Sequence, residues 1–161
     1  MDYRELVQCG YRYALSLTNN GHDAEDLVQE AFVKIIGKNK DVSKTYFYKT
    51  IKSLFIDKYR RESLVLFDTE QAEQDSHSED SSDEDLAMSA EHMEMSLEIL
   101  RPFEREVLFL SAVEEYTAEE IAKMMDRPRG TVLSLIHRSK IKIRDKIRIL
   151  EHKQKLIQNK N

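Results

Sequence analysis

The chain has 161 residues, of which 40% are hydrophobic and 34% charged, with four glycines, two prolines and one cysteine. This length fits one domain or two small ones, and the scarcity of glycine and proline favours an all-α fold. The single Cys9 excludes an intrachain disulfide and a thiolate zinc site, and no apolar run is long enough for a membrane span. The amino terminus has no basic and apolar leader, so we expect a cytoplasmic protein.

The net charge of −5 is unevenly distributed along the chain. Residues 1–61 carry a net +3, residues 62–98 carry −13, and residues 99–161 carry +5. Within the last block, residues 127–160 hold 11 basic and 2 acidic side chains, a distribution that a phosphate backbone attracts. For the charge run alone, a solvated helix face is the competing interpretation.

The first block has strong helical periodicity. Residues 3–17 suit one helix, which a breaker cluster at residues 18–21 ends. Asp23 then has the place of an N-cap, with Asp26 as the acid of a capping box. A second helix follows, whose core-facing stripe contains Ala24, Leu27, Val28, Ala31, Phe32, Ile35 and Ile36. A third helix is expected from about residue 43 to residue 61.

The acidic block predicts a flexible linker over residues 63–86. Residues 73–85 contain no aromatic residue and only charged, small or polar side chains, so burial cannot offset the entropy of ordering them. A calcium loop is the competing idea, but an EF-hand needs a glycine at its sharp turn and none occurs here. The linker therefore separates a domain over residues 1–62 from a second domain over residues 87–161.

The second domain has the spacing of a helix-turn-helix. Helices are expected over residues 86–100 and from Pro102 to about residue 115, and a capping box at residues 117–120 opens a short helix that ends near Met125. A turn at residues 126–130 precedes a long basic helix. Ala122 offers the small residue that two steeply crossing helices need, and the apolar inner faces are formed by Ile121, Met125, Val132 and Ile136.

In this arrangement the second helix of the pair presents its outer face to the major groove of DNA. That face holds Arg129, Thr131, Ser134, His137 and Arg138. Phosphate contacts are expected from Lys140, Lys142 and Arg144. A small helical bundle with a basic flank, which needs no DNA, is the competing interpretation.

Several segments together resemble a known family. The segment at 23–32 (DAEDLVQEAF) is similar to the core-polymerase-binding helix of bacterial sigma factors of the extracytoplasmic-function class. The segment at 55–61 (FIDKYRR) resembles the end of the helix in that family that engages the minus-ten promoter element. The segment at 100–108 (LRPFEREVL), with 120–122 and 130–132, is similar to the carboxy-terminal domain that binds the minus-thirty-five element.

The resemblance implies roles for individual residues. It assigns the contact with core RNA polymerase to Glu25, Asp26, Gln29 and Glu30. It assigns the contact with the melted minus-ten element to Lys49, Lys52, Asp57, Lys58, Arg60 and Arg61. Leu133 and Leu135 stand where the family is commonly basic, which shifts readout of the minus-thirty-five element toward Arg129, Ser134 and Arg138.

The resemblance predicts a sigma factor, a subunit that directs core RNA polymerase to promoter DNA, with an anti-sigma protein as a conceivable further partner. The runner-up is a helix-turn-helix regulator that binds duplex DNA as a dimer, independently of polymerase. The sequence has no glycine-rich phosphate-binding loop, no His-Glu-x-x-His zinc motif and no nucleophile elbow. Its five histidines are not spaced as metal ligands would be. We therefore expect neither catalysis nor a metal or other cofactor.

Overall fold

The computed structural model describes residues 2–37, 42–62 and 97–159. These residues form helices and turns and contain no strand, which confirms the all-α prediction. None of the helices in these ranges has the length and hydrophobicity that crossing a membrane requires. The predicted linker at 63–86 and most of the predicted helix at 86–100 lie outside the described residues.

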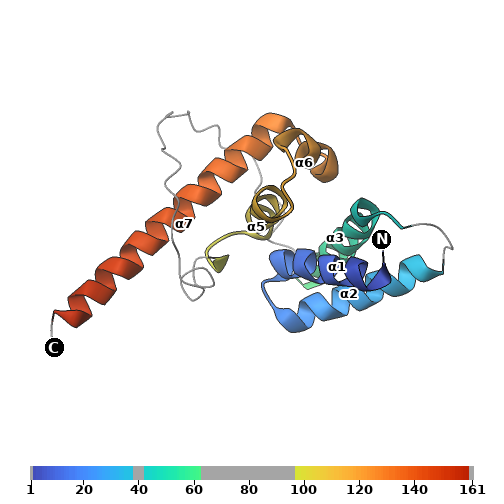
Figure 1. Ribbon diagram of the computed structural model, residues 1–161, viewed down its shortest axis with the longest axis horizontal. Coiled ribbons are helices and arrows are strands. Elements are labelled where there is room, and N and C mark those ends of the chain that lie inside the picture. The colour runs from blue at the N-terminus through green and yellow to red at the C-terminus, as the bar shows by residue number, and fades with distance from the viewer. Residues whose placement is uncertain (1, 38–41, 63–96, 160–161) are drawn as a thin grey trace.

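Three helices form the amino-terminal group: α1 (Tyr3–Thr18), α2 (Gly21–Ile36) and α3 (Lys44–Glu62). The carboxy-terminal group contains α5 (Pro102–Leu108), a π-helical continuation η1 (Phe109–Val113), α6 (Ala118–Met125) and α7 (Arg129–Gln158). The two groups lie side by side, and the carboxy-terminal end of α7 extends away from the rest of the molecule (Figure 1).

Two sequence-based details of the first group are wrong. Asn20, rather than Asp23, is the N-cap of α2, and its side chain accepts a hydrogen bond from the Asp23 backbone N–H at 3.1 Å. An asparagine is as good a cap as an aspartate, so the helix gains a turn by starting earlier. Ile36 was assigned to the core but is 51% exposed, because it lies in the last turn of α2, beyond the buried Ile35.

The helix-turn-helix is confirmed in its local detail. The Glu120 backbone N–H donates to Thr117 Oγ1 at 3.3 Å, and the Thr117 backbone N–H donates to the Glu120 carboxylate at 2.8 Å. Asp126 ends α6 in the left-handed conformation, with φ of 53°, which aspartate tolerates better than most residues. The turn is shorter than expected, because α7 starts at Arg129 after Pro128 at its N-cap, so Gly130 is helical.

The hydrophobic core continues from one group of helices into the other. Phe47, Ile51 and Phe55 of the first group belong to the same buried cluster as Val107 and Leu110 of the second. The composition of the acidic block predicted two domains joined by a linker, but not this direct packing between them. The boundaries at residues 62 and 87 stay predictions, since they fall at or within the undescribed segment.

Candidate nucleic-acid and polymerase interfaces

The acidic face of α2 is exposed. Glu25, Asp26, Gln29 and Glu30 are all exposed and lie off the buried stripe of the helix. Two local ion pairs join Glu30 to Lys34 at 3.2 Å and Asp26 to His22 at 3.9 Å. A groove of about 790 Å³ between α1 and α2 is lined in part by Glu25 and Gln29. The four predicted side chains therefore form one polar surface beside a groove.

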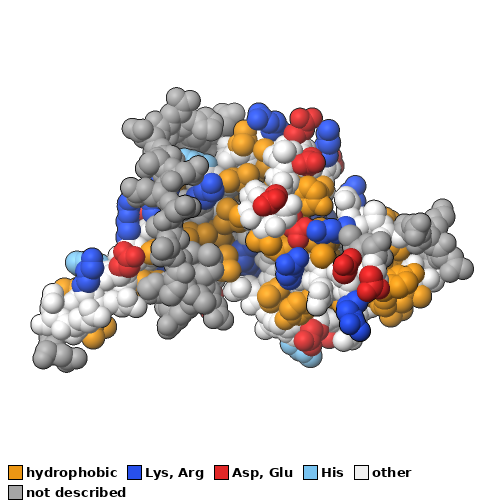
Figure 2. All heavy atoms as spheres, viewed as in Figure 1, with side chains coloured by type: hydrophobic (Ala, Val, Ile, Leu, Met, Phe, Trp, Pro, Cys, Tyr) orange, Lys and Arg blue, Asp and Glu red, His pale blue; other side chains and the backbone are white. Residues whose placement is uncertain are grey.

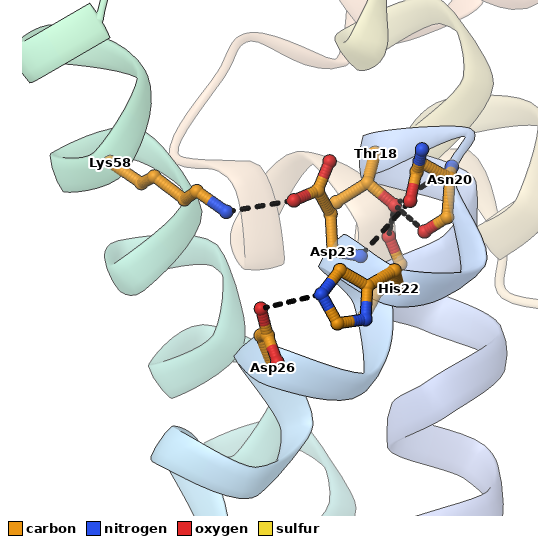
Figure 3. A network of polar contacts seen from close by, with 7 residues as sticks. Thr18, Asn20, His22, Asp23, Asp26 and Lys58 are labelled. Carbon is orange, nitrogen blue, oxygen red and sulfur yellow. Dashed lines mark hydrogen bonds and ion pairs between the residues drawn. The ribbon is translucent and has the colours of Figure 1, made fainter.

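The side chains of α3 that are predicted to contact DNA divide into two sets. Lys49, Arg60 and Arg61, together with the acidic Asp57, are exposed, as the prediction of a DNA contact requires. Lys58 instead reaches α2, where its Nζ lies 2.8 Å from Asp23 Oδ1 (Figure 3). The hydrogen bond to Asp23 raises the pKa of Lys58.

Lys52 is the second basic side chain of α3 that is engaged within the protein. Its side chain is only 15% exposed, and its Nζ lies 3.1 Å from Glu106 Oε2 of α5. The same ammonium lies 5.2 Å from the centre of the Phe103 ring, a cation–π contact. Lys52 therefore contacts the carboxy-terminal group of helices in this conformation.

The aromatic residues of α3 can be divided by their burial. Phe47, Tyr48 and Phe55 are buried core residues, and Tyr59 is half-buried with its ring 4.4 Å from that of Phe55. Tyr46 differs from them because it is 45% exposed. Its ring is the α3 aromatic most accessible to a DNA base.

The residues predicted to contact DNA lie along the first half of α7. Arg129 and Lys140 are exposed, whereas Thr131, Ser134, His137 and Arg138 are half-buried. Leu133 is 39% exposed and adds an apolar element to this face.

Lys142 has a structural partner within its own domain. Its Nζ lies 2.6 Å from Glu104 Oε1 of α5, and Glu104 also accepts a 2.9 Å hydrogen bond from the Arg101 backbone N–H. Glu104 thereby links the start of α5 to α7. Lys142 is therefore engaged within the protein in this conformation.

Sequence reasoning missed the charged residues that join the two groups of helices. Arg105, Glu106 and Glu114 come from the second group, and their partners come from α1 and α3. Arg105 and Glu106 stand in the segment that resembles the family, but nothing local marks them as buried. In Figure 2, acidic and basic side chains lie next to one another across the middle of the molecule.

The two groups also border a small, open cleft of about 340 Å³. Lys49, Lys52 and Arg60 line it from α3, and Met124, Met125 and Asp126 line it from the end of α6 and the turn that follows. The predicted minus-ten surface and the helix-turn-helix therefore face each other across this cleft.

The fold and its surfaces define a class of protein: an all-α protein of two helical groups, with a helix-turn-helix in one and an exposed acidic helix face on the other. Comparison with known proteins identifies the family. The family model for Sigma-70 region 2 matches residues 2–65, and the model for Sigma-70 region 4 matches residues 91–143. The chain belongs to the sigma-70 family, among the sigma factors of the extracytoplasmic-function (ECF) class.

Named relatives support this assignment. The chain is 31% identical over 144 residues to the ECF RNA polymerase sigma factor SigE of Mycolicibacterium smegmatis, covering 84% of this chain and 56% of that protein. It is 26% identical over 156 residues to the ECF RNA polymerase sigma factor SigW of Bacillus subtilis, covering 87% and 83%. The sigma factor RpoE of Bartonella quintana, solved with the anti-sigma factor NepR, has a similar fold, with a TM-score of 0.67 at 18% identity over 91% of this chain and 94% of that one.

Proposed function

We propose that this protein is a sigma factor that binds core RNA polymerase and directs it to promoters for transcription initiation. The observation that carries the proposal is the presence, in one chain of this family, of an acidic docking face on α2, a basic α3 and a helix-turn-helix. A polymerase-independent repressor needs only the last of these. We also propose that the protein acts in the cytoplasm, without catalysis and without a cofactor.

In this proposal, the exposed acidic face of α2 docks on core polymerase through Glu25, Asp26, Gln29 and Glu30. All four can be substituted without disturbing the apolar stripe that packs α2 against its neighbours. Charged side chains at the edge of an interface mainly set the rate of association with the partner and the dependence of that rate on salt.

The melted minus-ten element binds along α3. Lys49, Arg60 and Arg61 are exposed and contact phosphates, with Asp57 beside them. Lys52 and Lys58 contribute only after their internal ion pairs are exchanged for DNA. The exposed ring of Tyr46 stacks on an unpaired base, a contact that contributes roughly 1–3 kcal/mol per base.

The minus-thirty-five element binds in duplex form to the start of α7. Arg129 and Arg138 are the groups best suited to bidentate hydrogen bonds with guanine edges. Thr131, Ser134 and His137 lie on the same helix, and Lys140 contacts the phosphate backbone. Lys142 contributes to DNA binding only where its ammonium exchanges Glu104 for a phosphate.

The experiment that tests the function is transcription in vitro with core RNA polymerase and genomic promoter fragments. The proposal expects the chain to co-purify with core polymerase and to start transcripts at a defined set of promoters. Tight binding of the free chain to a palindromic duplex, with no effect on polymerase, would support the dimeric regulator instead.

Because the structurally similar sigma factor from Bartonella quintana is bound to an anti-sigma factor, we propose the same kind of partner for this chain.

A further inference from the structure

The fifth residue of α7, the helix that follows the turn of the helix-turn-helix, is an exposed leucine. Leu133 exposes 39% of its surface. The other large apolar side chains of these first turns pack inward: Val132 is fully buried, and Leu135 and Ile136 are half-buried against the hydrophobic core. Leu133 therefore presents an apolar group at the surface of the helix.

The side chains that share a face of α7 with Leu133 are polar or basic. Arg129 lies four residues before it and His137 four residues after it, a spacing that makes them neighbours on the helix surface. Lys140 continues the row one turn further on, and both Arg129 and Lys140 are exposed. Residues 127–160 hold 11 basic and 2 acidic side chains. The surface around Leu133 therefore complements a phosphate backbone better than an apolar protein surface.

Leu133 also lies in the part of α7 that is suited to contact base edges. In a helix-turn-helix, the amino-terminal residues of the second helix contact the bases in the major groove. The helix rises about 6 Å between Arg129 and Leu133, which is close to the rise of about two base pairs. Leu133 should therefore meet a base about two base pairs from the one that Arg129 contacts.

The chemistry of leucine restricts what it can recognise in the major groove. Its side chain has no hydrogen-bond donor or acceptor, and the apolar group that base pairs present in this groove is the C5-methyl of thymine. Against a G·C pair, the leucine would cover polar groups that lose water without gaining a partner, which weakens binding. Apolar attraction and this penalty both favour thymine at the contacted position.

We propose that Leu133 is a specificity-determining residue, which selects thymine at one position of the minus-thirty-five element by apolar contact with the thymine methyl group. The inference rests on the proposed function, which assigns duplex DNA to the start of α7. It adds the selected base and its place in the element: a thymine about two base pairs from a guanine contacted by Arg129.

The first test identifies the position. The full-length chain is combined with core RNA polymerase, and a promoter used by this holoenzyme is randomised across its minus-thirty-five element. Selection of bound promoters is expected to return thymine at one position, and selection with Leu133→Ala should lose the preference at that position alone. Leu156→Ala is the matched control, because Leu156 is 51% exposed and lies near the far end of the same helix.

The second test removes the methyl group and nothing else. Replacement of the selected thymine by uracil deletes the C5-methyl group and keeps every hydrogen-bonding group of the base. At one fixed salt concentration, the parent holoenzyme should bind the uracil promoter about fourfold more weakly, as burial of one methyl group implies. With Leu133→Ala, the two promoters should be bound almost equally, because alanine is too short to contact the methyl group. The difference between these two ratios measures the direct coupling of Leu133 to the methyl group.

The third test changes the preference instead of removing it. Arginine forms bidentate hydrogen bonds with O6 and N7 of guanine, so Leu133→Arg should shift the selected base at this position from thymine to guanine. Leu156→Arg adds the same charge at the far end of the helix. It should leave the selected bases unchanged.

A selection with the parent chain that returns no thymine preference, or equal affinity for the thymine and uracil promoters, would overturn the inference without any variant. So would weaker polymerase binding in Leu133→Ala with an unchanged base preference, which would make Leu133 a contact with polymerase. If the chain forms no complex with polymerase, the proposed function fails, and the same selection with the free chain and random duplex decides the role of Leu133. The two failures are therefore distinguishable.

Discussion

Removal of a single hydroxyl from the contact between the two groups of helices gives a quantitative prediction. Tyr13→Phe keeps the ring that stacks on Tyr48 but deletes the donor that lies 2.6 Å from Glu106 Oε1. A hydrogen bond to a charged group contributes about 1.5–3 kcal/mol, and the deletion leaves a buried carboxylate oxygen without this donor. We expect the free energy of unfolding to fall by about 2 kcal/mol. With a urea m value of about 2 kcal/mol/M, the unfolding midpoint should fall by about 1 M.

Urea unfolding followed by circular dichroism at neutral pH measures this effect. Tyr3→Phe is the matched control, because Tyr3 lies on the same helix and is 62% exposed, so loss of its hydroxyl should leave the midpoint almost unchanged. A midpoint for Tyr13→Phe within error of that control would refute the claim that the Tyr13–Glu106 bond stabilises the folded protein.

The same variant has a distinct alkaline signature. Burial, and then the negative charge of Glu106, raise the pKa of Tyr13 well above its usual value near 10. Since the folded-state pKa is the higher one, this contribution to stability is fully present below about pH 10 and is lost as the pH rises toward the folded pKa. The loss is at most about 1.4 kcal/mol per pH unit for one group. Tyr13→Phe should make stability above pH 10 less dependent on pH.

Three further changes test other parts of the structure. Gly10→Ala should lower the free energy of unfolding by about 1–3 kcal/mol in urea unfolding, because the new Cβ would overlap the buried Phe47 ring. Gly37→Ala is the control, because its Cβ would meet no atom within 4 Å and the free energy of unfolding should not change. Thr117→Ala should cost about 1 kcal/mol through loss of the α6 cap, visible as a lower thermal midpoint; an unchanged midpoint would contradict the capping assignment. Charge reversal of the acidic docking face should weaken polymerase binding at least tenfold in a pull-down titration while the circular dichroism spectrum stays native, and normal affinity would remove the docking surface. The reversed residues are Glu25, Asp26 and Glu30.

The parts of the fold that could be predicted from the sequence are those set by local chemistry. The capping box at Thr117, the left-handed Asp126 and the apolar stripe of α2 each depend on residues within one or two turns of one another. The error at the start of α2 has the same origin: Asn20 and Asp23 are both good caps three residues apart, and sequence alone does not rank them.

The interdomain contact could not be predicted, because its partners are far apart in the chain. Tyr13 and Glu106 are separated by 93 positions, and Arg105 is 88 positions from Leu17. Periodicity shows which face of a helix is apolar but does not identify the neighbour that covers it. A glutamate and an arginine inside a short helix are usually exposed, so Glu106 and Arg105 carried no signal of burial. The partial occlusion of Lys52 follows from the same contact.

The most direct test of the central claim is the affinity of the full-length chain for core RNA polymerase from the same organism, measured by titration of a fluorescently labelled chain. We expect a saturable complex of one chain per polymerase that starts transcription at selected promoters, with affinity reduced when the charges of the α2 acidic face are reversed. Failure of a correctly folded chain to form any complex would show that it is not a sigma factor.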